Sequence, residues 1–209
     1  MKTVGIFSWD KEAARREMVR SARGLKEGSV RIAVRRDGNF LVHRSPTLPY
    51  SARQMREGIS VRTVPSRWPA GESGWAQAKT SERLAGVLAK WESPGAPEAL
   101  RIGRHGYVTE GTVSNLFFVR DGKLTTAPAW LGVLEGVTRR RVIRAAGKLR
   151  VPVREVPFNR NDLFNAEEAF LTNVLMEVLP VCEVDGRRIG SGRPGPVTRR
   201  LMKVLHEAD

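Results

Sequence analysis

The chain has 209 residues, 41% of them hydrophobic and 28% charged, as is ordinary for a water-soluble globular protein. This length allows one large domain or two small ones with a sizeable core. No apolar run approaches the roughly 18 residues of a membrane span, and the first residues lack the apolar stretch of a secretory signal. Cys182 is the single cysteine, so no disulfide can form within the chain. We therefore expect a cytoplasmic protein with no membrane partner.

The formal charge of +14 comes from 36 Lys and Arg residues against 22 Asp and Glu residues. Such a charge is typical of nucleic-acid-binding modules, which stay an alternative from another class of function. Only the stretches TRRRVIR (138–144) and RPGPVTRR (193–200) cluster these cations, and no interleaved aromatic residues suited to base stacking are evident. The composition therefore favours an arginine-rich surface, or a preference for anionic small molecules, over nucleic acid as a partner.

In the first half, the pattern predicts a helix over 10–24, a hairpin over 29–44 around Asp37-Gly38 and a strand over 60–66. A second helix is expected in QAKTSERLAGVLAKW (77–91), where Leu84, Val87, Leu88 and Trp91 recur at helical spacing on one face. Lys79 comes just before the expected cap at Thr80 or Ser81, where the helix dipole disfavours a cation. This position raises the question of whether Lys79 is kept for its amine.

The second half begins after a Pro- and Gly-rich stretch at 92–99, which is the best candidate linker. Short strands with glycine turns follow, then a helix over 136–149, strand-like segments at 151–157 and 167–186, and a terminal helix over 195–208. The pattern predicts an α+β fold with an N-terminal α/β domain at 1–91 and a C-terminal domain at 100–209.

Three stretches could carry chemistry, although each has an ordinary structural explanation. In YVTEGTVSNLFF (107–118), Glu110 and Asn115 border a turn and could simply form it. In LGVLEGVTRRRVI (131–143), a glycine turn opens a helix whose free N–H groups could hold a phosphate. In FLTNVLMEVLPV (170–181), Thr172 and Asn173 interrupt an apolar run and need hydrogen-bond partners, which a bend between strands could supply.

Other catalytic centres lack support in the sequence. His43, His105 and His206 show no metal-ligand spacing, and a zinc site is not expected with one cysteine. No serine stands in a G-x-S-x-G context, so an α/β-hydrolase is not indicated.

Together, these stretches resemble the class IV (fold-type IV) pyridoxal-phosphate aminotransferases in order and spacing, over about residues 29–205. The segments GVLEGVTR and FLTNVLM, with the Arg83-Leu84 pair, are most similar to aminodeoxychorismate lyase within that family. The resemblance implies a small N-terminal α/β domain and a larger mixed C-terminal domain that binds pyridoxal 5'-phosphate. It also implies a homodimer.

The resemblance assigns a role to each candidate residue. Lys79 matches the lysine that joins the cofactor covalently, and Glu110 matches the carboxylate that faces the pyridine nitrogen. Asn115 is expected to be structural and to aim Glu110. The remaining cofactor-binding residues are Leu134 against the ring, Gly136, Val137 and Thr138 in the phosphate cup, and Thr172 with Asn173 as a second phosphate contact.

The activity expected from this resemblance is cleavage of 4-amino-4-deoxychorismate into 4-aminobenzoate and pyruvate, a step in folate biosynthesis. The alternative is an aminotransferase of branched-chain or D-amino acids, which would use the same Lys79 and Glu110. The substrate is a small molecule in either case.

Three departures from the family pattern affect these expectations. No H-x-x-R-L segment is found, so the chain is expected to be N-terminally short, and neither Arg15 nor Arg16 can be assigned as the phosphate-binding arginine. Glu82 stands where the lyase pattern usually has asparagine. The basic RIGRHG (101–106) replaces a commonly acidic turn and is expected to affect only the surface. A non-catalytic remnant of the family is therefore a further alternative.

Overall fold

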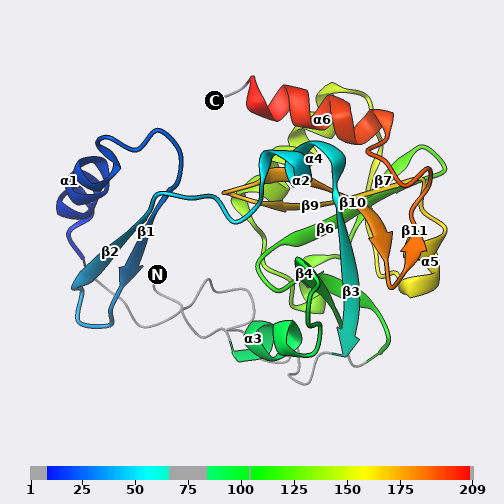
Figure 1. Cartoon of the computed structure of the whole chain (residues 1–209), viewed down its shortest axis with the longest axis horizontal. Coiled ribbons are helices and arrows are strands. Elements are labelled where there is room, and N and C mark those ends of the chain that lie inside the picture. Colours follow the sequence, from blue (N-terminus) through cyan, green and yellow to red (C-terminus); the bar gives the residue numbers. More distant parts are fainter. Residues whose placement is uncertain (1–8, 66–83, 104, 208–209) are drawn as a thin grey trace.

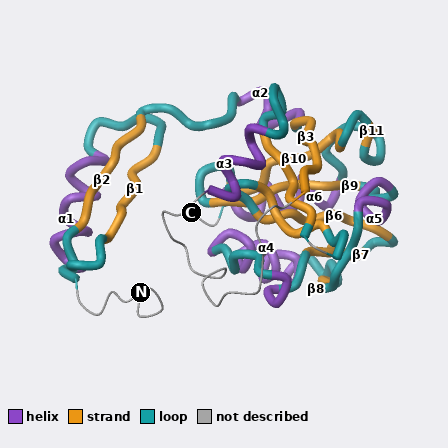
Figure 2. The backbone as a smooth tube through the Cα atoms, turned by 90° about the horizontal axis from the view of Figure 1, so that it is seen from below, coloured by secondary structure: helices purple, strands orange, loops and turns teal. Residues whose placement is uncertain are grey.

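The structure is a computed structural model that describes residues 9–65, 84–103 and 105–207. Figure 1 shows a small helix-and-hairpin unit at one side and a large sheet with its helices at the other, joined through the residues that follow β2. Figure 2 shows the same arrangement after a quarter turn. None of the helices in these described ranges is long and apolar enough to cross a membrane.

The small unit contains α1 (Lys11–Ala22), β1 (Ser29–Val34) and β2 (Phe40–Ser45). Asp10 caps α1, because its side chain accepts a hydrogen bond from the Ala13 N–H at 2.8 Å. The two strands pair antiparallel across the Asp37-Gly38 turn, and α1 packs against both. The predicted helix and hairpin are therefore confirmed.

The large sheet has the strand order β11-β10-β3-β4-β5-β6-β7-β8, and β9 pairs with both β10 and β6. These pairings close a circuit through β3, β4, β5, β6, β9 and β10, so most of the circuit's backbone groups are satisfied without a free edge. The strands are β3 (Ile59–Pro65), β4 (Glu98–Ile102), β5 (Val108–Gly111), β6 (Asn115–Arg120), β7 (Lys123–Thr126), β8 (Val153–Glu155), β9 (Glu168–Asn173), β10 (Glu177–Val184) and β11 (Arg187–Arg188).

Strand β6 is buried on both faces and separates two cores. Leu116 and Phe118 contribute to one core, inside the strand circuit, while Phe117 and Val119 contribute to the other, beneath helices α4 (Val137–Lys148) and α6 (Pro196–His206). This double burial explains why β6 reads as an unbroken apolar run rather than an alternating one. Asn115 is the first residue of β6.

Two features extend beyond the sequence expectation. Strand β3, whose residues fall within the expected N-terminal domain, pairs in parallel with β4 and β10, and Glu98 and Ala99 from the expected linker begin β4. The large sheet thus runs across the boundary expected at 92–99, since the buried Ile59, Val61 and Val64 need neighbouring strands. The second feature is α2 (Ala52–Glu57), a helix absent from the expected elements, which is held by a capping box between Ser51 and Gln54.

Helix α3 (Leu84–Trp91) confirms the described part of the helix predicted over 77–91, but much of its apolar face is exposed to solvent. Leu84, Val87 and Trp91 are 50%, 47% and 77% exposed. The helix packs through small residues instead, because Ala89 is buried in one cluster with Val64 and Ala99.

Glu168 holds the start of α6, the terminal helix. Its buried carboxylate accepts hydrogen bonds from the Val197 N–H at 3.0 Å, the Thr198 N–H at 2.7 Å and the Thr198 hydroxyl at 2.6 Å. We expect Glu168→Gln to lower the free energy of unfolding by about 1–3 kcal/mol, because a buried donor loses its acceptor. Urea unfolding would measure this change. Glu207→Gln, which removes only an exposed 3.8 Å contact to Lys203, should shift it by less than about 0.5 kcal/mol.

Candidate functional site

Glu110, at the end of β5, is a buried carboxylate surrounded by hydrogen-bond donors. Its Oε2 accepts from the Asn115 Nδ2 at 3.1 Å and from the Leu134 N–H at 3.0 Å, while its Oε1 accepts from the Arg101 guanidinium. Burial raises the pKa of Glu110 to about 7, against the lowering effects of Arg101, the Leu134 N–H and Arg139. A carboxylate has about four acceptor positions, so one remains after these three bonds.

Asn115, at the start of β6, contacts the end of β5 and the segment before α4. Its Nδ2 donates to Glu110 and, at 2.7 Å, to the Leu134 carbonyl. Its Oδ1 lies so close to Gly136 that a Cβ atom there would come within 2.5 Å of it. The expectation that Asn115 is structural and aims Glu110 is therefore supported by its contacts.

The contact between Asn115 and Gly136 makes a sharp prediction. Gly136→Ala should destabilise the chain by about 1–3 kcal/mol, because the added methyl group must displace the Asn115 side chain. Gly147→Ala is the matched control in the same helix, where a Cβ meets nothing within 4 Å, and it should instead gain about 0.5–1 kcal/mol. Thermal unfolding of both variants would test this, and equal shifts would contradict it.

Helix α4 begins beside this cluster. Its N-cap is Gly136, which provides no side-chain cap bond, so the first N–H groups of the described helix are not capped by that residue. Thr138 is buried, whereas the Val137 side chain is 56% exposed. An uncapped helix start with its positive dipole end suits an anion such as a phosphate.

Thr172 and Asn173 end β9 at the same place, because Thr172 pairs with Asn115 in the β6–β9 register. The Thr172 hydroxyl is buried and has no hydrogen-bond partner among the described residues. Asn173 is partly used by the turn between β9 and β10: its Oδ1 accepts from Leu175 and Met176, and its Nδ2 donates to the Val113 carbonyl at 3.3 Å. The Thr172 hydroxyl is thus available for a hydrogen bond to a ligand. Asn173 stabilises the turn between β9 and β10 in addition to its predicted role at the phosphate.

The structure brings most of the predicted site residues together at one end of the central strands. The direct contacts join Glu110, Asn115, Leu134 and Gly136, and strand register adds Thr172 and Asn173. Val137 and Thr138 follow Gly136 at the start of α4. Lys79, Glu82 and Arg83 lie outside the described residues, so their predicted roles stay predictions.

The expectation that RIGRHG affects only the surface is wrong for Arg101. The Arg101 side chain is only 15% exposed and forms an ion pair with Glu110, which is 12% exposed. The sequence contained a pattern that could have predicted this contact. A hairpin that turns near Gly103 and Gly106 places Arg101 beside Glu110. The observed pairing of Leu100 with Gly111 has this register.

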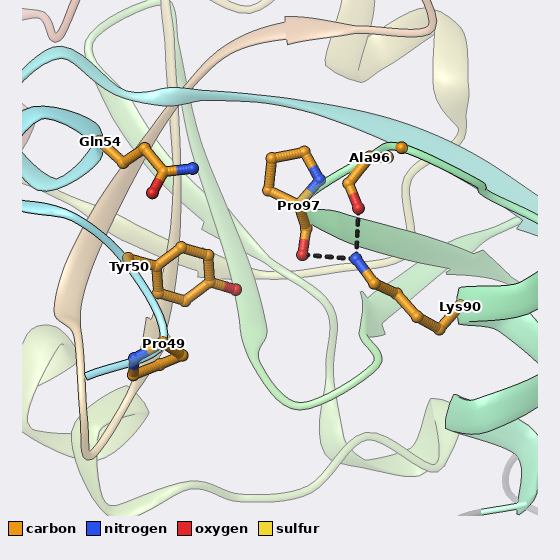
Figure 3. Close-up of a pocket in the computed structure, with 7 residues that line it drawn as sticks. Pro49, Tyr50, Gln54, Lys90, Ala96 and Pro97 are labelled. Carbon is orange, nitrogen blue, oxygen red and sulfur yellow. Dashed lines mark hydrogen bonds between the residues drawn. The ribbon is translucent and has the colours of Figure 1, made fainter. Parts of the chain in front are cut away.

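A separate open cavity of about 420 Å³ is lined by Pro49, Tyr50, Gln54, Lys90, Gly95, Ala96 and Pro97. Figure 3 shows how its labelled side chains lie. None of the predicted site residues that the structure describes lines this cavity. The Lys90 ammonium group donates to the carbonyls of Ala96 and, at 2.7 Å, Pro97, so this amine is engaged by the backbone. Within the described part of the chain, no group of His, Cys, Asp and Glu residues could hold a metal ion. The cluster around Glu110 is therefore the better candidate site.

The cluster combines features that suit a planar cationic heterocycle carrying a phosphate. Glu110 retains one acceptor position for an N–H, and the start of α4 with the Thr172 hydroxyl offers donors to an anion. Exposed apolar side chains flank it in the same loops, with Val113 47% exposed and Val174 71% exposed. The loop end of the closed mixed sheet is therefore the candidate site for a cofactor of this kind.

The sequence model of the family described as "Amino-transferase class IV" matches residues 5–184, and the chain belongs to this family. The chain is 38% identical over 149 residues to a probable branched-chain-amino-acid aminotransferase of Aquifex aeolicus, covering 70% of this chain and 45% of the relative. It is 37% identical over 156 residues to the branched-chain-amino-acid aminotransferase of Pseudomonas aeruginosa, covering 73% and 50%. The chain thus spans about half the length of these curated relatives.

Solved structures of similar proteins have the same fold. A crystal structure of the Escherichia coli branched-chain amino acid aminotransferase aligns with a TM-score of 0.82 at 29% identity, covering 93% of this chain and 69% of that chain. The branched-chain amino acid aminotransferase of Thermobaculum terrenum, in its PLP-bound holo-form, aligns with a TM-score of 0.71 at 30% identity, covering 81% and 56%. The predicted α+β, fold-type IV class is therefore confirmed.

Proposed function

We propose that the chain binds pyridoxal 5'-phosphate and acts as a class IV aminotransferase on branched-chain amino acids. The observation that carries this proposal is the meeting at one site of the Glu110 carboxylate, a start of α4 without a capping side chain from Gly136, and a Thr172 hydroxyl with no hydrogen-bond partner among the described residues. The similarity to branched-chain aminotransferases supports the reaction and the substrate class. This favours the aminotransferase alternative over the lyase that the sequence motifs favoured.

Each part of the cofactor would meet a specific group of the chain. The N–H groups of Val137 and Thr138 and the Thr172 hydroxyl would bind the phosphate, with Asn173 at its rim. Leu134 would pack against the ring, and Glu110 would accept a hydrogen bond from the protonated pyridine nitrogen at its free acceptor position. The bound cofactor supplies an electron sink for a carbanion at the amino-acid α-carbon.

Two residues of the chain would act on different protons. Glu110 holds a proton on the pyridine nitrogen, because an anionic partner stabilises the cationic ring. The Lys79 amine, when neutral, is proposed to remove the proton from the substrate α-carbon, and the resulting ammonium group would deliver that proton to the cofactor carbon that bears the nitrogen. Asn115 and the Leu134 N–H hold Glu110 in place during both steps.

The lyase activity is a second proposal, supported by the segments GVLEGVTR and FLTNVLM and by Arg83-Leu84. Both activities use Lys79 and Glu110, so the products must decide between them. Release of pyruvate from 4-amino-4-deoxychorismate without an added keto acid would favour the lyase. Amino transfer from leucine or valine to 2-oxoglutarate would favour the aminotransferase.

Three further expectations are also proposals: a cytoplasmic location, a homodimer and a domain boundary. The chain is proposed to be a cytoplasmic homodimer, which sedimentation equilibrium would test through a mass twice that of one chain. A boundary near 92–99 is proposed in the order of the chain, although β3 and β4 pair across it in one sheet, and limited proteolysis would test whether the stretch is cleaved. The phosphate-binding arginine stays unassigned, because no motif supports Arg15 or Arg16, both of which lie exposed on α1.

The test of cofactor binding is a titration of the chain with pyridoxal 5'-phosphate, followed by absorption in the near-visible region. We expect saturable binding that pyridoxal without the phosphate reproduces only weakly, because the start of α4 binds the anion. A chain that takes up neither compound would contradict the proposed function.

A further inference from the structure

Arg101 is the one described cation in direct contact with Glu110. It lies on β4, beside β5, and its guanidinium donates to the Glu110 Oε1. The two side chains are 15% and 12% exposed, so water screens their attraction only weakly. The Arg101 Nε is buried without a hydrogen-bond partner in the described structure, so the ion pair with Glu110 is the contact that holds this cation there.

The groups that face Glu110 come from four elements. Arg101 belongs to β4, Asn115 to β6, the Leu134 N–H to the segment before α4, and Arg139 to α4. All the direct contacts are donors, which suits an ionised carboxylate. Arg139 acts only from a distance, since its guanidinium donates to the Ala127 carbonyl and to Glu155.

Burial opposes this arrangement, because a carboxylate removed from water favours its neutral form. It raises the pKa of Glu110 to about 7 even with both arginines present. The charge state of Glu110 at neutral pH is therefore finely balanced, and the loss of the direct cation would tip it towards the neutral acid. A neutral Glu110 could not stabilise a protonated pyridine nitrogen.

We propose that Arg101 is a positioning residue of the cofactor site, which keeps Glu110 ionised and fixes its Oε1 while leaving one acceptor position for the pyridine nitrogen. The second part of this proposal rests on the proposed function, whereas the effect on Glu110 does not require a cofactor. Arg101 would thus set the electron-withdrawing strength of the bound ring without touching the substrate.

The first experiment measures the charge of Glu110 in the chain without cofactor. The carboxyl stretch of Glu110 is isolated by infrared difference spectroscopy against Glu110→Gln and followed through a pH titration. We expect a midpoint near pH 7 in the natural sequence and a rise of about 1–3 pH units in Arg101→Met, since an opposite charge at close range lowers a carboxyl pKa by that amount. Arg101→Lys should restore a midpoint close to that of the natural sequence.

Two further variants keep this experiment decisive. Arg120→Met removes an arginine that pairs with Asp162 at 3.2 Å on the surface, and it should leave the Glu110 midpoint unchanged. Arg101→Gln keeps an amide donor without the charge and replaces Arg101→Met if that variant does not fold. An unchanged midpoint in the neutral Arg101 variant would overturn the proposal.

The second experiment adds pyridoxal 5'-phosphate and follows the pH dependence of its absorption. The natural sequence and Arg101→Lys should share one profile, and Arg101→Met should shift its transition in the direction of the infrared midpoint. If no chain takes up the cofactor, the proposed function fails, while the infrared titration still decides the effect of Arg101 on Glu110. If the cofactor binds and the profiles of all three chains coincide, the role of Arg101 in the cofactor site is refuted.

Discussion

Lys79→Ala should lose amino transfer by at least about 10²–10⁴-fold, because that is the usual contribution of one positioned proton-transfer group. The loss of covalent attachment adds to this effect. Lys79 lies outside the described residues, so the prediction rests on the motif and on the site built around Glu110. The direct measurement is borohydride reduction of the cofactor-loaded chain followed by mass spectrometry of its peptides. We expect the label on the peptide that contains Lys79.

Lys90→Ala is the matched control for this prediction. Lys90 lies on α3, after Lys79 in the sequence, and its ammonium group donates hydrogen bonds to the carbonyls of Ala96 and Pro97. Its replacement should leave both the label and the activity in place. A label that persists in Lys79→Ala, or one that vanishes in Lys90→Ala, would show that the motif assigns the wrong lysine.

The sequence could predict the parts of the site that depend on local pattern. Glu110 and Asn115 lie on either side of one turn. Gly136 directly precedes α4, and a glycine before a predicted helix can be recognised in the sequence. The hydrogen bond between Glu110 and Asn115 joins residues only five positions apart, so a short-range motif suffices to indicate it.

The remaining parts depend on contacts between distant segments. The pairing of β6 with β9 brings Thr172 opposite Asn115, and the pairing of β3 with β10 closes the strand circuit. Such pairings are decided by which faces the whole sheet buries, and no local pattern shows them. Arg101 could have been predicted in part. The hairpin register places it beside Glu110, but a charged residue in a basic turn is usually expected to be exposed.

Glu110→Gln should lower the rate of amino transfer by about 10²–10³-fold, the usual cost of removing one preorganised electrostatic contact from an active site. Glutamine keeps an acceptor for the Asn115 and Leu134 donors but carries no charge to hold the pyridine proton. Cofactor affinity should fall much less than the rate, because the phosphate is proposed to bind at α4. Parallel measurement of the two quantities tests this, and equal losses would contradict the assigned role of Glu110.

The same substitution should also change how stability depends on pH in the chain without cofactor. Burial raises the pKa of Glu110 from 4.5 to about 7, so the folded chain holds a proton that the unfolded chain has released between these values. The stabilisation is complete below about pH 4.5 and is lost as the pH rises through about 7. Because one pKa unit corresponds to about 1.4 kcal/mol, the free energy of unfolding should fall by about 3 kcal/mol across this window relative to Glu110→Gln.

Urea unfolding at several pH values measures the difference in the free energy of unfolding between the two chains, in which all other titrating groups cancel. A difference that stays flat would mean that Glu110 is ionised throughout and that its environment carries no cost, whereas a falling difference shows that the chain gives up stability to keep this carboxylate charged at the site.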